Sequence, residues 1–248
     1  MCSSDLQRPL VRRAVALSLD RTTISRRVTL GLRPPLQDLV PPSLAGSVPR
    51  AWPSYNPQAA RSLYRQAGYC RGQRLHLPLT FRSNVPSDRL FALTWQAQLR
   101  QDLGDCVTLE VSGMEATTAY RQLGQGAFPL ILLDWMGDFP DADNYLVPLL
   151  SCDQAQGQRC LQGGSAASGS FWTRPGLPQE LQRSASLRGE ARTALLQRIQ
   201  RQAAAATPYL PLWLVAPRAW AQRTISQPQF DGSGRLLLQN LRQSGLGR

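Results

Sequence analysis

The alternation of apolar and polar residues changes period several times along the chain, and each period predicts a type of element. Apolar residues recur about every 3.6 positions in helices and every second position in half-buried strands. One helical face near the start consists of Val11, Ala14, Val15 and Ser18. Asp20 is a suitable cap for a second helix that runs to Gly31. The prolines between positions 34 and 53 then predict an extended, non-helical segment.

The clearest helix signal lies between residues 56 and 68. Asn56 can cap this helix, Pro57 suits its first position, and Gly68 suits the position after its end. Its apolar face consists of Ala60, Leu63, Tyr64 and Ala67. We therefore predict a helix with defined ends here.

Strands and helices alternate after this helix. The predicted order is a strand at 75–81, a helix at 88–103 ended by Gly104, a strand at 107–111, a helix at 116–123 and a strand at 128–133. This alternation is typical of an α/β fold with a mixed, largely parallel sheet flanked by helices. Pro78 has no N–H to donate, which predicts that the first strand lies at an edge of the sheet.

The second half of the chain begins with a polar loop that contains Cys152 and Cys160. These cysteines could form a disulfide or remain two unrelated thiols, and the sequence leaves both open. Phe171 and Trp172 could line a cleft or anchor this loop to the core. Helices at 177–187 and 189–206 and a buried strand at 209–215 are predicted next. The last roughly thirty residues contain too few apolar residues to form a domain alone.

The chain has a large positive charge, but this charge does not by itself indicate a function. The formal net charge is +12, and all 28 basic residues are arginine. The complete absence of lysine indicates a compositional bias, and the arginines form no clustered patch, so nucleic-acid binding is disfavoured. No apolar run reaches the roughly 20 residues needed to cross a bilayer. The first residues show no signal-peptide pattern.

The most unusual segment of the sequence is 134–145. It holds four of the 16 acidic residues of this basic protein within ten positions, directly after the apolar run 130–133 and among aromatic residues. In proteins with open parallel sheets, ligands bind beyond the carboxyl ends of the strands. This segment is expected to lie at that place. An acidic and aromatic site suits a ligand with a positive group, such as a free amino terminus.

Other chemistries fit the sequence poorly. A zinc site is disfavoured, because there is no C-x-x-C pair and the only histidine, His76, is expected to be an exposed strand residue. A calcium loop is disfavoured, because Tyr145 stands where a ligand is needed and no closing glutamate follows. The serines at 165, 168 and 170 have no histidine partner for a hydrolase triad. No cofactor, metal or enzymatic activity is predicted.

The order of motifs resembles the carboxy-terminal half of the family 5 extracellular solute-binding proteins, the dipeptide and oligopeptide receptors of ABC importers. The matching segments are 11–21, 55–63, 67–69, 96–99 with 103–104, 135–146 and 208–212. The resemblance runs from about residue 10 to about residue 230. It implies a periplasmic-binding-protein-like (type II) fold, in which two lobes close about a hinge on the ligand.

Three segments follow from this resemblance. Residues 1–9 are expected to be a non-native-looking or linker start, 10–225 the carboxy-terminal substrate-binding lobe, and 226–248 a tail that returns to an absent amino-terminal lobe. The sequence is therefore interpreted as a fragment. A partner chain that supplies the other lobe is the less favoured alternative.

The resemblance also implies a binding site and partners. In the peptide-binding members, an aspartate three residues after a tryptophan pairs with the peptide ammonium, and this pattern falls on Asp138 and Trp135. Asp134 and Phe139 complete the predicted ligand-binding set. Asp141, Asp143 and Asn144 are expected to cap the next helix. The predicted ligand is a di- or oligopeptide, since Asp138 favours a free amine. The alternative is a non-peptide solute, because the family also includes receptors for metal complexes, sugars and opines.

The implied protein is a monomeric, non-enzymatic receptor outside the cytoplasmic membrane. It would deliver its solute to a membrane permease and the ATPase that drives it. The alternative from another class is an arginine-rich module that binds nucleic acid.

Overall fold

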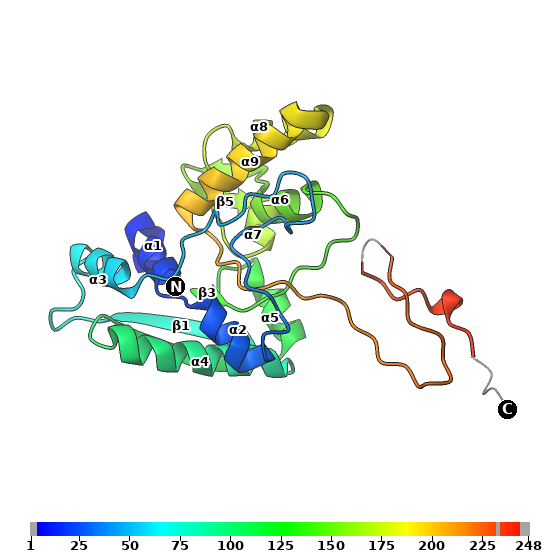
Figure 1. The fold of residues 1–248 in the computed structure, drawn as a ribbon. Coiled ribbons are helices and arrows are strands. Elements are labelled where there is room, and N and C mark those ends of the chain that lie inside the picture. The colour runs from blue at the N-terminus through cyan, green and yellow to red at the C-terminus, as the bar shows by residue number, and fades with distance from the viewer. Residues whose placement is uncertain (1–3, 232–233, 244–248) are drawn as a thin grey trace.

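The computed structural model describes residues 4–231 and 234–243. The elements in chain order are η1 (Ser4–Gln7), α1 (Pro9–Leu17), α2 (Arg21–Thr29), α3 (Pro57–Gln66), β1 (Leu75–Arg82), α4 (Pro86–Leu103), β2 (Val107–Met114), α5 (Ala116–Leu123), β3 (Leu130–Ile131), α6 (Asp143–Leu150), β4 (Gln154–Gln156), β5 (Arg159–Gln162), α7 (Gly164–Ala167), α8 (Leu177–Ser186), α9 (Gly189–Ala206) and η2 (Leu238–Asn240). Figure 1 shows their arrangement.

Local signals account for the ends of several helices. The carboxylate of Asp20 accepts a hydrogen bond from the backbone N–H of Thr23 (3.0 Å) at the start of α2. The side chain of Asn56 does the same for Ala59 (2.9 Å) at the start of α3. Each bond satisfies an N–H group that has no partner within its own helix. The predicted helices at 88–103, 116–123, 177–187 and 189–206 are confirmed to within a few residues.

The main sheet is parallel, with the strand order β2-β1-β3. β1 pairs with β2 along its whole length, from Leu75 opposite Val107 to Arg82 opposite Met114. β3 is shorter than the predicted strand at 128–133 and pairs with β1 only at Leu79 and Thr80. Helices flank this sheet, so the predicted α/β class is confirmed. A separate antiparallel pair, β4 and β5, lies in the cysteine loop.

The prediction that Pro78 marks an edge strand is wrong, because β1 is the central strand. Successive residues of a strand direct their backbone groups to opposite sides. Thr80 directs its carbonyl toward the β3 side, where it accepts from Leu132 N (2.9 Å). Pro78 therefore faces the same side, but β3 begins to pair only opposite Leu79. The missing N–H leaves no ladder hydrogen bond unmade.

The buried side chains form two large clusters. The first surrounds the sheet and includes Val15 of α1, Tyr64 of α3, Leu77 of β1 and Trp95 of α4. The second joins α6, α8 and α9 to the segment 39–52 and includes the buried Trp52. The chain passes between the two clusters several times. Members of the first come from residues 11–28, 60–132 and 210–213, and members of the second from residues 39–52, 142–150 and 172–209.

The predicted buried strand at 209–215 is wrong. These residues are half-buried or exposed, and they contact the proline-rich segment in an antiparallel arrangement with two hydrogen bonds. Leu36 N donates to Leu212 O (3.0 Å) and Leu214 N donates to Pro34 O (2.9 Å). The pairing cannot become a regular ladder, because prolines, among them Pro211, have no N–H to donate.

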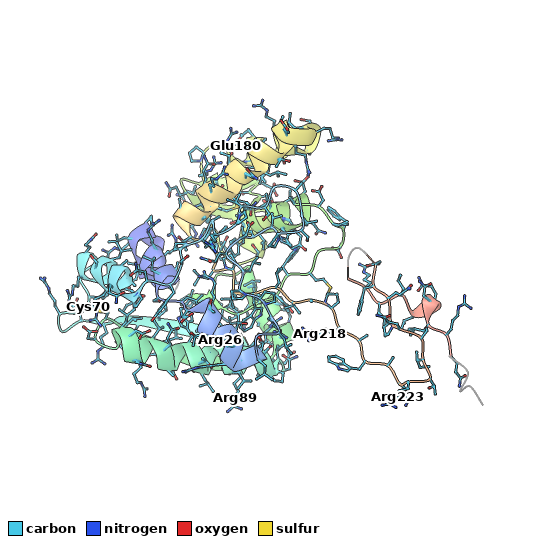
Figure 2. The ribbon with its side chains drawn as sticks, viewed as in Figure 1. Arg26, Cys70, Arg89, Glu180, Arg218 and Arg223 are labelled. Atoms are coloured by element: carbon cyan, nitrogen blue, oxygen red, sulfur yellow. A yellow bond between two sulfur atoms is a disulfide. The ribbon has the colours of Figure 1, made fainter. Side chains whose placement is uncertain are left out.

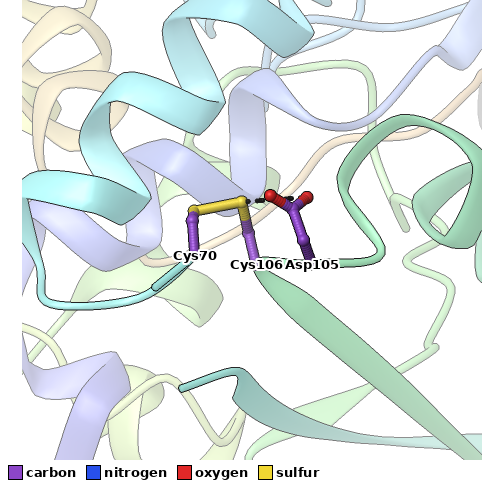
Figure 3. Close-up of side chains that lie close together, drawn as sticks. All are labelled: Cys70, Asp105 and Cys106. Atoms are coloured by element: carbon purple, nitrogen blue, oxygen red, sulfur yellow. Dashed lines mark hydrogen bonds between the residues drawn. A yellow bond between two sulfur atoms is a disulfide. The ribbon is translucent and has the colours of Figure 1, made fainter. Parts of the chain in front are cut away.

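Two disulfides connect the described cysteines. One joins Cys70, after α3, to Cys106, directly before β2 (Figure 3). The other joins Cys152 to Cys160, which decides the alternative that the sequence left open. Trp172 packs in the second cluster, and Phe171 packs against the Cys152–Cys160 disulfide, so both residues anchor this loop.

The carboxy-terminal segment leaves the body of the molecule as an extended ribbon (Figure 1). Arg223 lies along it, away from the helices (Figure 2), whereas Arg218 lies nearer the body and donates to the carbonyl of Leu32, just after α2 (3.2 Å). The segment doubles back on itself through isolated bridges, and none of its described residues from 216 onward is buried. Among the described helices, none combines the length and apolarity required to cross a membrane.

Candidate functional site

The candidate site lies in the loop between β3 and α6, beyond the carboxyl ends of β1 and β3. Leu132 continues the pairing with β1 for one residue, and the chain then turns away from the sheet. Residues 134–142 therefore emerge where a parallel sheet leaves a crevice. The structure places all four predicted ligand-binding residues on this loop, but it gives their side chains different surroundings.

Asp134 is held by a cluster of polar side chains at the end of β1. Arg82, whose side chain is 7% exposed, donates to Asp134, to the hydroxyl of Tyr120 (3.2 Å) and to Asp88 (2.7 Å). Tyr120 also donates to Asp134 (3.1 Å). Burial opposes the charge of Arg82, but hydrogen bonding and the charges of Asp88 and Asp134 raise its pKa overall. Asp134 therefore has two strong partners within the protein.

A small cavity of about 90 Å³ adjoins this cluster. Its charged lining consists of Arg33, Arg82, Asp88 and Asp134, and Trp213 contributes an aromatic wall. The guanidinium of Arg33 lies over the ring of Trp213, 5.5 Å from its centre, and donates to Ser87 (3.2 Å). The cavity can hold a few water molecules or a small group of a ligand.

Asp138 lies near the middle of the loop with its carboxylate in solvent. The side chain is 73% exposed, and its described partner is the guanidinium of Arg235 on the carboxy-terminal segment, at 3.2 Å. Trp135 is partly exposed, and its indole N–H donates to the carbonyl of Asn144 (2.7 Å). Phe139 is also exposed. The carboxylate of Asp134 is also exposed, at 65%, but it is paired with the buried Arg82, whereas Asp138 is paired with an arginine that is itself 67% exposed.

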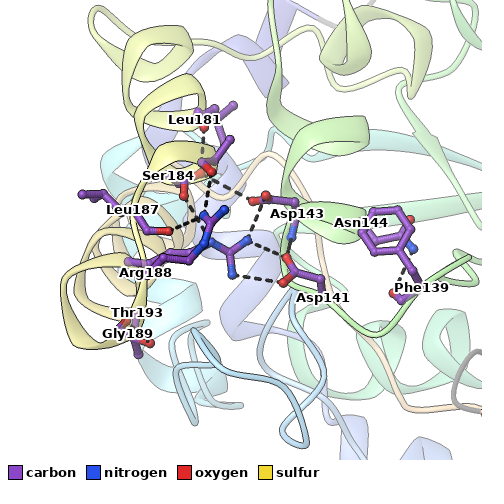
Figure 4. Close-up of polar contacts among 12 residues, drawn as sticks. Phe139, Asp141, Asp143, Asn144, Leu181, Ser184, Leu187, Arg188, Gly189 and Thr193 are labelled. Atoms are coloured by element: carbon purple, nitrogen blue, oxygen red, sulfur yellow. Dashed lines mark hydrogen bonds and ion pairs between the residues drawn. The ribbon is translucent and has the colours of Figure 1, made fainter.

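Asp141 and Asp143 connect the loop to α9. Arg192 donates to both oxygens of Asp141 (3.0 and 2.6 Å) and lies 2.8 Å from Asp143. Figure 4 shows Asp143 near Ser184 of α8, whose hydroxyl donates to it (3.4 Å). The hydrogen bond from Arg192 lowers the pKa of Asp141. Asp141 also accepts from the backbone N–H of Asp143 (2.8 Å) and so supports the start of α6, as predicted. Asp143 and Asn144 lie inside the first turn and do not cap it.

Two arginines that organise the site, Arg82 and Arg192, were not predicted from the sequence. Arg82 ends a predicted strand, and its position at the carboxyl end of that strand is a signal that could have identified it. Arg192 lies on a helix with no local feature that distinguishes it from the other arginines. Its partners are 51 residues away in sequence, so only the tertiary structure reveals the contact.

The remaining candidates have structural contacts. His76 is exposed and lies 3.3 Å from Glu110 on the neighbouring strand. Ser165 donates to the carbonyl of Trp172 (2.6 Å), and Ser168 contacts the hydroxyl of Tyr209 (2.6 Å). These serines stabilise the cysteine loop.

One group within the described residues has the composition of a metal site, namely Cys70, Asp105 and Cys106. Both of its sulfur atoms belong to a disulfide (Figure 3). They are therefore not available as thiolate ligands.

Comparison with known proteins places the chain among binding proteins. Residues 4–157 match the model of the bacterial extracellular solute-binding proteins, family 5 middle. The di/tripeptide-binding protein 2 of Pseudomonas aeruginosa (strain UCBPP-PA14) is 27% identical over 210 residues, which are 82% of this chain and 37% of that protein. The chain therefore spans little more than a third of the length of this relative.

Solved structures show the same fold. The crystal structure of a dipeptide-binding protein from Pseudoalteromonas sp. SM9913 in complex with Met-Leu has a TM-score of 0.76 at 21% identity, over 96% of this chain and 47% of that one. NikA from Brucella suis in complex with Fe(III)-EDTA has a TM-score of 0.73 at 19% identity, over 96% of this chain and 48% of that one.

Proposed function

The chain belongs to the bacterial extracellular solute-binding proteins of family 5, and we propose that it forms the carboxy-terminal lobe of a peptide receptor for an ABC importer. Its ligand in this proposal is a short peptide with a free amino terminus. The proposed lobe comprises residues 10–225, and 226–248 is the tail that returns to the other lobe. The range 1–9 is proposed as a linker start, although Leu6 packs against the first cluster.

The observation that carries this proposal is the accessible carboxylate of Asp138. An ammonium group offers three donors, and a carboxylate is its strongest common acceptor in proteins. Asp134 and Asp141 already have arginine partners at least half buried within the body of the protein, whereas the partner of Asp138 lies on an exposed segment. Asp138 is therefore the carboxylate of this loop that a ligand can reach with the least rearrangement.

The aromatic residues beside Asp138 fit the rest of a peptide. Trp135 and Phe139 expose apolar surface on the same loop. Such side chains provide flat walls for a peptide backbone or its side chains, and Trp135 is fixed by its hydrogen bond to Asn144. Closure of a second lobe would remove the water that weakens the contact between ammonium and carboxylate. The di/tripeptide-binding relative supports a peptide of this kind.

A non-peptide solute is the second candidate. The cavity next to Asp134 is lined by Arg33 and Arg82, and guanidinium groups suit the carboxylates of an anionic ligand such as a metal chelate. The similarity to NikA in complex with Fe(III)-EDTA supports this alternative. A nucleic-acid-binding module is less well supported, since Arg82, the buried arginine of this cavity, is already paired with Asp88 and Asp134.

The proposed receptor works outside the cytoplasm as a monomer and delivers its solute to a permease and ATPase. Two disulfides, Cys70–Cys106 and Cys152–Cys160, support an oxidising compartment. No catalytic step is proposed for it.

The test measures peptide binding to the protein expressed from its complete gene. Di- to pentapeptides with free and with acetylated amino termini are titrated against wild type, Asp138→Asn and the control Asp153→Asn. Asp153 is an exposed carboxylate outside the loop. We expect free-amine peptides to bind wild type and the control, and to bind Asp138→Asn about tenfold or more weakly, because a hydrogen bond between charged groups is lost.

Each other outcome contradicts a defined part of the proposal. If acetylated peptides bind as tightly as free-amine peptides, Asp138 does not bind the ammonium group of the ligand. Binding of anionic chelates with no binding of any peptide would favour the second candidate.

A further inference from the structure

A second cavity lies between α1, the segment 50–54 and α9. Its volume is about 280 Å³, and it is open to solvent. The charged residues of its lining are Arg13, Arg50 and Arg201. None of its lining residues is shared with the cavity next to Asp134. It is therefore distinct from the proposed peptide site.

The charge in this cavity is uncompensated. Its lining contains three arginines and no carboxylate. Within residues 4–231 and 234–243, Arg13 and Arg50 have no ion pair or side-chain hydrogen bond, and Arg201 makes a single long contact to Gln197 (3.4 Å). Other arginines in the part of the chain that the structure describes do pair with carboxylates, among them Arg61, Arg82, Arg174, Arg192, Arg198 and Arg235.

The walls of the cavity are held in place by contacts between distant segments. Trp52 is almost completely buried and donates to the carbonyl of Tyr209 (2.8 Å). Arg21 donates to the carbonyl of Pro53 (3.1 Å). Arg12 donates to the carbonyl of Ala206 (2.7 Å), which ties α1 to the end of α9. These contacts fix the backbone segments that carry the three arginines, which are themselves exposed. The guanidinium of Arg12 offsets the partial negative charge at the end of α9.

The backbone of Arg50 is in a conformation that favours glycine. Its φ is 60°, and a side chain in this left-handed region costs free energy that glycine would avoid. Strained residues of this kind concentrate at functional sites. At this position the residue is an arginine in spite of the conformational cost, and this arginine lines the cavity.

We propose that this cavity binds a phosphate-type oxyanion through Arg13, Arg50 and Arg201, with the hydroxyl of Ser54 as a further donor. Guanidinium groups match the geometry of phosphate oxygens with two parallel hydrogen bonds each. Three of them without a carboxylate attract a multiply charged anion more strongly than a singly charged one. The phosphate group can come from a free anion or from the headgroup of an anionic phospholipid, and both sources present the same chemistry.

The experiment compares two triple variants of the protein expressed from its complete gene. The cavity variant carries Arg13→Gln, Arg50→Gly and Arg201→Gln. The control variant carries Arg26→Gln, Arg89→Gln and Arg100→Gln, and it loses the same charge from exposed positions on α2 and α4 (Figure 2 shows Arg26 and Arg89). Inorganic phosphate and pyrophosphate are titrated by calorimetry, and phosphatidylglycerol vesicles are tested by co-sedimentation against phosphatidylcholine vesicles.

We expect the cavity variant to lose about tenfold or more in affinity, while the control keeps the affinity of wild type. Loss of phosphate or pyrophosphate binding identifies a free anion as the source, and selective loss of vesicle binding identifies a lipid headgroup. The proposal is overturned if wild type binds none of these probes. It is also overturned if both triple variants lose binding equally, which would show a general charge effect.

The single variant Arg50→Gly separates binding from folding. Glycine adopts φ near 60° without strain, so the melting temperature should not fall. A several-fold loss of affinity without a loss of stability supports a role of the Arg50 side chain in anion binding. Unchanged affinity in this variant and in the triple cavity variant would overturn it.

Discussion

The four carboxylates between residues 134 and 143 differ in how strongly they are already paired with arginines. Asp134 shares the buried guanidinium of Arg82 with Asp88, and Asp141 and Asp143 share Arg192. A carboxylate with such a partner gains little from a ligand, because the existing pair must first be broken. Asp138 differs, since both it and Arg235 are largely exposed and an exposed ion pair contributes about 0–1 kcal/mol.

This difference predicts the effect of removing Arg235. If Asp138 receives the ligand ammonium, Arg235 competes with the ligand for the same carboxylate. We expect Arg235→Ala to raise the affinity for free-amine peptides by up to about fivefold and to change the free energy of unfolding by less than about 0.5 kcal/mol. Calorimetric titration and urea unfolding measure the two quantities. Arg242→Ala, on the same segment, is the control, and a fall in affinity in Arg235→Ala would show that Arg235 contacts the ligand instead.

The sequence predicts the exposed residues of this loop better than it predicts their ion pairs. The resemblance predicted that Trp135 and Asp138 bind ligand, which stays a prediction, and the structure shows both side chains exposed on the loop. It did not predict that Asp134 is paired, because its partner Arg82 is 52 residues away. Ion pairs between distant positions depend on how elements pack, and no local pattern encodes them.

At the scale of elements, Arg192 connects α9 to the start of α6. The pKa of Asp141 is lowered by the hydrogen bond from Arg192, so the stabilisation is present above the unfolded pKa, about 3.9, and is lost as the pH falls through the lower folded pKa. We expect Asp141→Asn to unfold about 1 kcal/mol more easily at pH 7 and to approach wild type near pH 2. Urea unfolding from pH 2 to pH 7 checks this, with Asp153→Asn as the control. A difference that stays constant over this range would contradict it.

Elements with local signals were predicted well, and those that depend on distant partners were not. Asn56 and Pro57 define the start of α3 within the sequence itself. Pro78 misled the prediction, because its effect depends on where β3 begins to pair. The segment 209–215 has a strand-like apolar pattern, but its partner 34–36 is rich in proline and allows only two hydrogen bonds.

At the scale of the whole molecule, the two disulfides are expected to contribute unequally. Cys70–Cys106 closes a loop of 36 residues and Cys152–Cys160 a loop of 8. A longer loop loses more entropy in the unfolded chain when it is closed. We expect replacement of both cysteines by alanine to cost about 4 kcal/mol for the first pair and about 2 kcal/mol for the second. Urea unfolding of the two double variants gives both values, and a larger loss for the shorter loop would contradict this account.

The α/β class could be predicted from the alternation of periods, whereas the strand order and the Cys70–Cys106 disulfide could not. Both depend on which segments meet after a crossover. The sequence offers no signal for that choice beyond the preference of neighbouring elements to pack together.

The passage of the chain between its two clusters has a consequence for the order in which the protein forms. Arg12 on α1 can form its hydrogen bond to the carbonyl of Ala206 only after 194 further residues have been synthesised. Trp52 likewise needs the carbonyl of Tyr209. During synthesis from the amino terminus, neither cluster can be completed until α9 has emerged. Contacts between such distant residues slow folding. The two clusters therefore stay incomplete until residues 206–213 have been synthesised, and up to that point their apolar surfaces are only partly covered.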